Sequence, residues 1–223
     1  MRMMEHFLNQ EGLFVVQGLI DTIQRNKEYL SEIDGAIGDG DHGINMNKGF
    51  TLCRERLGDA PSSLTAGLKV LGKVLLTEIG GSMGPLYGTF FREMAKASEN
   101  QEIIDKTVFG AMLTAALAGV QTLGNAQVGD KTLVDTLVPA VNAYQAALAA
   151  GESFGAALAQ MREAAERGKE STRDLVAKIG RASRLGERSR GVLDAGATSC
   201  YLLLASMADS IGEYLAQHGS TQI

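Results

Sequence analysis

The chain has 223 residues, with 26 acidic and 21 basic side chains and a formal net charge of −5 at pH 7. This length predicts that residues 1–223 form a single domain with a substantial core. The charges are mixed along the chain, which argues against a nucleic-acid partner. The sequence has no apolar run suited to a membrane span or a secretory signal, so we expect a cytoplasmic protein with no membrane partner.

Apolar residues recur at helical spacing along most of the sequence. This periodicity predicts amphipathic helices within residues 13–30 and 64–75. Further helices are predicted at about 44–57, 85–98, 104–123, 131–149, 153–179 and 196–217. No segment has the period-2 pattern of a strand. The sequence therefore predicts an all-α fold of about eight amphipathic helices.

Residues that typically begin or end helices support these boundaries. Asp105 and Ser153 are suited to N-caps, and Pro85 to a first helical position. Pro139 is expected to kink the helix that contains it. Helix stops are expected at Gly124, Gly151 and Gly180.

The 27 glycines are concentrated between the predicted helices. Four stretches are rich in glycine, namely 35–43, 80–88, 124–129 and 186–196. In an array of antiparallel helices, alternate connections lie at the same end. We therefore expect these four segments to share one end of the molecule. Cys53 and Cys200 lie inside apolar helical patterns and are expected to be buried thiols.

Three aspartates, Asp34, Asp39 and Asp41, occur close together in the first glycine-rich segment. Neighbouring glycines allow the backbone to turn tightly, so the carboxylates can converge on a hard divalent cation such as Mg²⁺. An EF-hand loop is excluded, because an alternate-acid pattern counted from Asp39 fails at Gly43 and Ile44. The alternative is a helix N-terminus capped by Asp41, with the other acids in solvent.

The second segment, residues 80–84, matches the G-x-S-x-G pattern of hydrolase nucleophiles. That motif requires a preceding strand and a later base histidine, whereas a helix is predicted before it and only His218 follows. A phosphate-binding helix N-terminus with Ser82 as a donor is the better interpretation. A tight turn without a ligand is the alternative.

The third segment, residues 124–132, resembles a Walker A loop with one extra residue and no preceding strand. A P-loop fold is not supported. Asp130 and Lys131 are candidates to seat a nucleotide, or Asp130 caps the next helix.

The fourth segment carries arginines, which either pair with nearby acids or lie in solvent. One of them opposite the three aspartates would complete a phosphoryl-transfer site. Asp194 is either the cap of the last helix or a nucleotide contact. The four arginines are Arg181, Arg184, Arg188 and Arg190.

Together these motifs resemble the nucleotide-binding L subunit of dihydroxyacetone kinases, over nearly the whole chain. The matching segments are 38–46, 80–88, 129–132, 180–183, 186–189 and 194–199. The resemblance implies a barrel of eight antiparallel helices, with ADP or ATP and two Mg²⁺ ions bound at one rim. It also implies that Asp34, Asp39 and Asp41 bind the metal. Family members usually have Ala where this chain has Gly40.

The resemblance implies no catalytic side chain beyond those that position metal and phosphate. The positions implied to bind the nucleotide are His42, Gly43, Ile44, Asn45, Gly81, Ser82, Gly124, Leu133, Arg181, Asp194, Ala195 and Gly196.

The resemblance further implies that a separate K subunit holds dihydroxyacetone or a similar ketose. A phosphohistidine subunit of the phosphotransferase system would restore the phosphoryl group. The chain starts near its first helix and ends shortly after its last, which favours this multi-subunit form. The alternatives are an ATP-dependent kinase subunit for another ketose, such as a tetrulose, and a non-enzymatic nucleotide-binding regulator that contacts a transcription regulator.

Overall fold

A computed structural model describes residues 5–59 and 62–218 of the chain. These residues form an almost entirely helical protein. The α-helices of the described residues are α1 (Leu13–Arg25), α2 (Lys27–Ile37), α3 (His42–Leu57), α4 (Leu64–Glu78), α5 (Met83–Ser98), α6 (Lys106–Leu123), α7 (Val134–Ala149), α8 (Phe154–Ser171) and α9 (Ala195–His218). The short 3₁₀ helices are η1 (Asn9–Glu11), η2 (Thr172–Asp174) and η3 (Arg181–Ser189).

The prediction that strands are absent is wrong. Strand β1 (His6–Leu8) pairs in antiparallel fashion with β2 (Ile103–Asp105), with His6 opposite Asp105. Each strand has three residues. A period-2 pattern cannot be recognised over so few positions, which explains the miss.

Two predicted helices are also shorter than their sequence patterns. The first pattern, residues 13–30, is divided at Asn26, which separates α1 from α2 and donates from Nδ2 to the carbonyl of Thr22 at 2.8 Å. The predicted helix 153–179 ends at Ser171. Gly180 is consequently not its stop: with φ of +76° it directly precedes η3.

Several local signals are confirmed. The carboxylate of Asp105 accepts hydrogen bonds from Thr107 and Val108 at the start of α6, and the hydroxyl of Ser153 accepts one from Ala156 in α8. Gly124 is the C-cap of α6, and Gly151, with φ of +75°, follows the C-cap of α7. Pro85 is the third residue of α5 instead of the first. Pro139 lies inside α7, and the kink it should cause remains a prediction.

Consecutive helices from α3 to α9 pack against one another, and α1 contacts both α9 and α3, so that these neighbour relations form a closed cycle. Helix α2 packs on α3 and lies beside α9. The apolar faces meet in one continuous core, which includes Leu19, Phe50, Leu71, Phe91 and Leu204. Cys53 and Cys200 are buried free thiols, as predicted.

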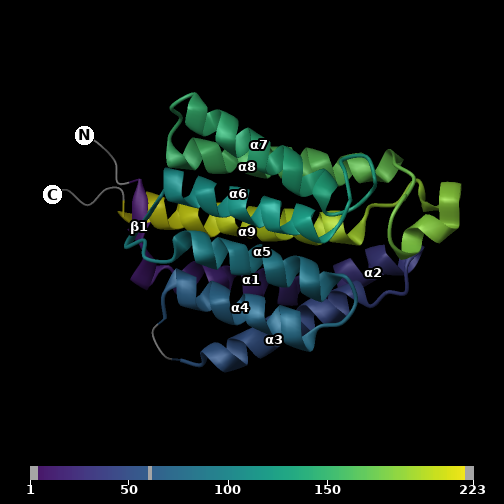
Figure 1. The fold of residues 1–223 in the computed structure, drawn as a ribbon, viewed down its shortest axis with the longest axis horizontal. Coiled ribbons are helices and arrows are strands. Elements are labelled where there is room, and N and C mark those ends of the chain that lie inside the picture. The colour runs from purple at the N-terminus through teal and green to yellow at the C-terminus, as the bar shows by residue number, and fades with distance from the viewer. Residues whose placement is uncertain (1–4, 60–61, 219–223) are drawn as a thin grey trace.

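Figure 1 shows that the two ends of the helix array differ. Strand β1 and the last turn of α9 lie at one end, which we call the terminal end. The links α2–α3, α4–α5 and α6–α7 lie at the opposite end together with η3, which we call the loop end (Figure 1). The four glycine-rich segments therefore meet there, as the alternation of helix direction predicts.

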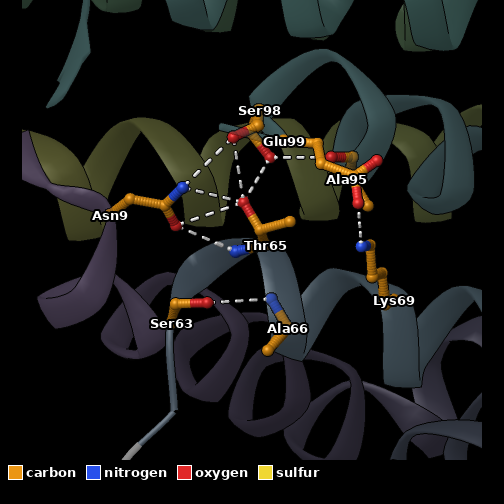
Figure 2. Close-up of polar contacts among 8 residues, drawn as sticks. All are labelled: Asn9, Ser63, Thr65, Ala66, Lys69, Ala95, Ser98 and Glu99. Atoms are coloured by element: carbon orange, nitrogen blue, oxygen red, sulfur yellow. Dashed lines mark hydrogen bonds and ion pairs between the residues drawn. The ribbon is translucent and has the colours of Figure 1, made fainter. Parts of the chain in front are cut away.

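At the terminal end, a buried polar cluster joins η1 to α4 and α5 (Figure 2). Asn9 donates from Nδ2 to the Thr65 hydroxyl at 2.8 Å and accepts at Oδ1 from the Thr65 amide at 3.1 Å. The hydroxyls of Thr65 and Ser98 are 2.7 Å apart. Within the described ranges, no helix combines the length and apolarity that crossing a bilayer requires.

Candidate functional site

The three aspartates of the first glycine-rich segment converge at the loop end. Asp34 lies in α2, Asp39 in the following loop, and Asp41 immediately before α3. Each offers a carboxylate oxygen, and these oxygens all lie within 4.8 Å of one another. Oxygen donors at this spacing are suited to a hard divalent cation.

Two glycines allow the chain to bring the carboxylates together. Gly40 has φ of +76°, a conformation that is strained for other residues, and turns the chain between Asp39 and Asp41. Gly43 is buried where α3 crosses α2, and a Cβ at this position would lie 2.0 Å from the carbonyl oxygen of Lys27. Only glycine permits this close approach of the two backbones.

Asp41 stands at the N-cap position of α3, but its side chain makes no capping hydrogen bond. Instead, the amide of His42 donates to Oδ2 of Asp34 at 3.3 Å. The α3 N-terminus therefore uses a carboxylate from the preceding helix. This geometry contradicts the alternative in which Asp41 serves as an ordinary capping side chain.

Arg181 in η3 reaches the acidic segment from a distant part of the sequence. Its Nη1 forms an ion pair with Asp39 and lies 3.8 Å from Oδ2 of Asp41. Arg181 thus pairs with two of the three carboxylates, which leaves the cluster with an excess of negative charge. Asp39, Arg181 and Arg184 also line an open cavity of about 360 Å³ between the end of α2 and η3.

His42 connects the acidic segment to the interior. Its Nε2 lies 2.9 Å from the hydroxyl of Ser199 in α9, and that hydroxyl lies 2.6 Å from the phenol of Tyr87 in α5. Burial lowers the pKa of His42 to about 4, and the charge of the nearby Asp34 opposes only part of this shift. The imidazole is therefore neutral at physiological pH and fixed by its hydrogen bond.

The α4–α5 link forms an exposed turn. Gly81 has φ of +70°, and a Cβ there would meet no atom within 4 Å. Ser82 is the exposed N-cap residue of α5 and makes no side-chain capping bond. Helix α4 precedes this turn, and His218 ends α9 at the terminal end, so the hydrolase interpretation is contradicted (Figure 1). The free hydroxyl and the helix N-terminus remain suited to a phosphate.

The α6–α7 link places Lys131 in the interior and not toward a ligand. Its Nζ donates to four backbone carbonyl groups. The prediction that the ammonium of Lys131 helps to seat a nucleotide is therefore wrong. Asp130 accepts from the amide of Gln127 at 2.8 Å and pairs with Lys178 at 3.2 Å. It therefore closes its own turn instead of capping α7.

Leu133, one of the predicted nucleotide positions, lies beside the start of α9. A Cβ at Gly196 would lie 3.6 Å from Cβ of Leu133, which is 6% exposed. Asp194 caps α9 by accepting from the amide of Ala197 at 2.7 Å, and its carbonyl accepts from the amide of Thr198. Burial raises the pKa of Asp194 to about 7, while the bond from Ala197 lowers it. The capping alternative for Asp194 is therefore correct, and its contact with a nucleotide stays a prediction.

The remaining predicted nucleotide positions lie on the same end of the molecule. Ile44 is 54% exposed and Asn45 is half-buried on the first turn of α3. Gly124 is exposed at the end of α6, and Ala195 is buried at the start of α9. Their contacts with a nucleotide remain predictions.

Our sequence reasoning missed Asp135, Tyr87 and Ser199. The Asp135 carboxylate accepts from the amides of Gly129 and Thr132 at 2.6 and 2.7 Å, which fixes the third loop. The spacing of Thr132 and Asp135 before an apolar run is that of a capping box, so this signal was available. Tyr87 and Ser199 lie in helices far apart in the sequence, and no local pattern predicts their meeting.

Comparisons with known proteins show which family the chain resembles. The family model described as the DAK2 domain matches residues 36–209. The ADP-binding subunit DhaL of PEP-dependent dihydroxyacetone kinase 1 from Listeria innocua is 40% identical, over 84% of this chain and 89% of the relative. The D-erythrulose kinase of Mycolicibacterium smegmatis is 35% identical, over 83% of this chain but only 32% of the relative.

A solved structure shares the fold. The native dihydroxyacetone kinase of C. freundii superposes with a TM-score of 0.66 at 25% identity, over 88% of this chain. This chain spans 33% of that enzyme. A second structure of the same enzyme is a complex with AMP-PNP and Mg²⁺, with a TM-score of 0.65 and 23% identity.

Proposed function

The chain belongs to the DAK2 domain family, and from this premise we propose that it is the nucleotide-binding subunit of a dihydroxyacetone kinase. In this role it binds ADP or ATP with Mg²⁺ and passes a phosphoryl group to dihydroxyacetone or a similar small ketose. The relative from Listeria innocua, which is 40% identical, is an ADP-binding subunit of such a kinase. The family match over residues 36–209 spans three of the glycine-rich segments and nearly all of the first, and Asp34 lies just before it.

The observation that carries the proposal is the cluster of Asp34, Asp39 and Asp41, with Arg181 against it. Carboxylate oxygens within 4.8 Å of one another fit a hard cation, and a guanidinium beside them fits a phosphate oxygen. Phosphoryl transfer requires both kinds of group in one place. The chain supplies them from two segments that are far apart in the sequence.

In the proposed mechanism, Asp34, Asp39 and Asp41 hold Mg²⁺. When bound, Mg²⁺ neutralises charge on the nucleotide phosphates. Arg181 then contributes a fixed positive charge near the transferred group, and the exposed hydroxyl of Ser82 donates a hydrogen bond to phosphate. No side chain of this subunit acts as a nucleophile, so its contribution is to position the phosphates and stabilise their charge.

The packing behind the site keeps these groups in place. His42, held neutral by burial and bonded to Ser199, fixes the first turn of α3. Leu133 lies close to Gly196 at the start of α9, and we propose that these two positions border the adenine ring. We also propose that the nucleotide lies along the loop end and that the site takes two Mg²⁺ ions. In this proposal the whole chain forms one domain of the eight-helix barrel type.

We propose that the ketose is bound by a separate K subunit and that a phosphohistidine subunit of the phosphotransferase system supplies the phosphoryl group. The relative from Listeria innocua supports this assembly, because its name describes it as one subunit of a PEP-dependent kinase. The substrate pocket would then lie on the partner, and the loop end would face it.

A reconstitution assay tests the proposal. The chain is mixed with a K subunit, dihydroxyacetone and either the phosphohistidine donor or ATP. We expect dihydroxyacetone phosphate to form with the phosphohistidine donor and catalytic ADP. A failure to form sugar phosphate with either donor would refute the kinase role and favour the non-enzymatic regulator.

A second candidate is an ATP-dependent kinase subunit for a tetrulose. The 35% identity to the D-erythrulose kinase of Mycolicibacterium smegmatis favours it, although this chain spans only 32% of that enzyme. The same assay with erythrulose and ATP separates the two candidates. Product from erythrulose with ATP, and none from dihydroxyacetone with the phosphohistidine donor, would select this second function.

A further inference from the structure

Lys131 is a buried lysine whose contacts the proposed function does not use. Its side chain is 1% exposed. The ammonium donates to the backbone carbonyls of Thr172, Leu175, Ser189 and Val192, at 2.7, 3.2, 2.7 and 2.5 Å. Four carbonyl oxygens share three N–H donors, so the ammonium is enclosed much as a bound monovalent cation would be.

These four carbonyls come from the two ends of one long connection. Thr172 and Leu175 precede η3, whereas Ser189 is the last residue of η3 and Val192 follows it. The connection between α8 and α9 therefore leaves the helix array and returns to it at a neck that Lys131 holds together. We call residues 176–190 the η3 loop.

Other contacts at the neck are fewer and weaker. The amide of Gly191 donates to the carbonyl of Arg173 at 2.7 Å, and the amide of Ala177 donates to the hydroxyl of Ser189 at 2.9 Å. Both are neutral hydrogen bonds, which contribute less than bonds from an ammonium. The guanidinium of Arg190 also donates to the carbonyl of Asp174, but this contact is exposed to solvent. Lys131 makes four such bonds from a buried position and is therefore the main tie between the two ends of the η3 loop.

The backbone of Lys131 supports a specific role. Its φ of +63° lies in the left-handed region, which costs free energy for a residue with a side chain. Glycine would avoid this cost but would lose the ammonium. The strained backbone at Lys131 is therefore offset by the four hydrogen bonds of its ammonium.

The η3 loop also carries Arg181, the residue that meets the acidic segment. Arg181 is the first residue of η3 and forms an ion pair with Asp39. An exposed arginine on a loop has many rotamers and backbone positions available, so its contribution to the site depends on how firmly the loop is fixed.

We propose that Lys131 is a positioning residue of the nucleotide site, which clamps the neck of the η3 loop and thereby holds Arg181 against the acidic cluster. The lysine acts at a distance and does not touch the phosphates. Its consequence for nucleotide retention rests on the proposed function, whereas its effect on the η3 loop does not.

The test compares variants by hydrogen–deuterium exchange and by the rate of ADP release in Mg²⁺. Lys131→Met keeps an unbranched side chain that is one atom shorter, and it removes the N–H donors. Lys178→Met is the matched control. Lys178 lies in the η3 loop itself and carries the same charge as Lys131, but it is exposed and forms a surface ion pair with Asp130. Arg181→Met and the Lys131→Met/Arg181→Met double variant complete a double-mutant cycle, which measures whether the two residues act together.

For Lys131→Met we expect exchange of peptides within 176–190 and the rate of ADP release each to rise about tenfold or more, the size expected when charged hydrogen bonds to buried carbonyls are lost. Lys178→Met should leave both near the wild-type values. Arg181→Met should speed ADP release without changing the exchange. The double variant should release ADP no faster than the faster single variant, because Lys131 acts through Arg181.

Chemical rescue covers the case in which Lys131→Met does not fold. Lys131→Gly removes the whole side chain and suits the positive φ, and n-butylammonium replaces the missing atoms. Added n-butylammonium should restore protection of 176–190, whereas tetramethylammonium, which has the charge but no donor, should not. In the wild-type protein, the ammonium of Lys131 should also give a slowly exchanging ¹⁵N–¹H signal.

Unchanged exchange of 176–190 in Lys131→Met would overturn the proposal, and so would faster exchange with unchanged ADP release. Additive effects in the double variant would overturn the link through Arg181. If the wild-type chain itself retains no ADP in Mg²⁺, the proposed function fails, and exchange and rescue alone then decide whether Lys131 clamps the loop.

Discussion

The two ends of the helix array treat polar groups in opposite ways. At the terminal end, Asn9, Thr65 and Ser98 are buried and bond to one another, as Figure 2 shows. At the loop end, Asp39 and Arg181 are exposed, and the charges of three carboxylates face one guanidinium. One cluster is neutral and complete within the chain, and the other has an excess of negative charge.

This difference separates stability from function. A buried polar cluster that satisfies its own donors and acceptors fixes the position of β1 and η1 on α4 and α5, and requires no ligand. The acidic cluster brings like charges together, which is unfavourable until a cation is bound. The terminal end should therefore control folding, and the loop end should control nucleotide binding. Substitutions at each end test whether folding and nucleotide binding are separated in this way.

The largest loss of stability is expected at Gly43. This residue is an exception to the contrast, because it lies at the loop end but serves the packing of α2 against α3. In Gly43→Ala, the added Cβ would lie 2.0 Å from the Lys27 carbonyl and 2.6 Å from the Ser31 hydroxyl. We expect a loss of about 3 kcal/mol in the free energy of unfolding, since the α2 and α3 backbones must separate. Denaturant titration measures this loss.

Gly212→Ala is the matched control for that substitution. Gly212 lies within α9 with no atom near its added Cβ, so alanine should stabilise the protein by up to about 1 kcal/mol. A Gly43→Ala variant with unchanged stability would show that the contact between α2 and α3 does not set the geometry of the acidic segment.

A smaller effect is expected at the terminal end. Asn9→Ala removes bonds to Thr65 and to the carbonyls of Ser98 and Gln101, and the buried amide of Thr65 loses its acceptor. We expect a loss of about 2 kcal/mol in stability with no change in nucleotide affinity. Ser63→Ala, which deletes only the α4 cap in Figure 2, should cost about 1 kcal/mol. Weaker nucleotide binding by folded Asn9→Ala would contradict the separation of the two ends.

The smallest effect on folding is expected for Arg181→Met. Its ion pair with Asp39 is exposed on both sides, so the free energy of unfolding should change by no more than about 1 kcal/mol. ADP affinity in Mg²⁺ should nevertheless fall about tenfold, since a charged contact to phosphate is lost. Isothermal titration measures the affinity, and Arg188→Met in the same 3₁₀ helix is the control. Equal affinities for the two variants would show that Arg181 does not serve the phosphates.

Much of the fold follows from local patterns. The apolar spacing of residues such as Leu68 and Leu71 predicts α4, and the caps Asp105 and Ser153 mark the starts of α6 and α8. What the patterns missed depends on contacts between distant segments. The pairing of β1 with β2 is one case, and the end of α8 at Ser171 is another, because the following residues are held by Lys131.

The site was predictable where it lies within one segment. Asp34, Asp39 and Asp41 are close in sequence, and the glycines among them indicate a tight turn. Residue spacing alone does not select one of the four arginines. The family resemblance implies Arg181 as a nucleotide contact, and the fold shows that it reaches Asp39. The role of Lys131 was misread because a Walker-like spacing favours a phosphate ligand, whereas burial turns its ammonium toward backbone carbonyls.

The most direct test of the central claim is native mass spectrometry of the purified chain in Mg²⁺, comparing wild type with Asp39→Asn and with Asp59→Asn. Asp59 is an exposed acid in the link between α3 and α4, at the terminal end. Wild type and Asp59→Asn should carry one ADP or ATP. Asp39→Asn should be folded, by circular dichroism, and free of nucleotide. Undiminished nucleotide in Asp39→Asn would contradict the assignment of the acidic cluster as the metal site.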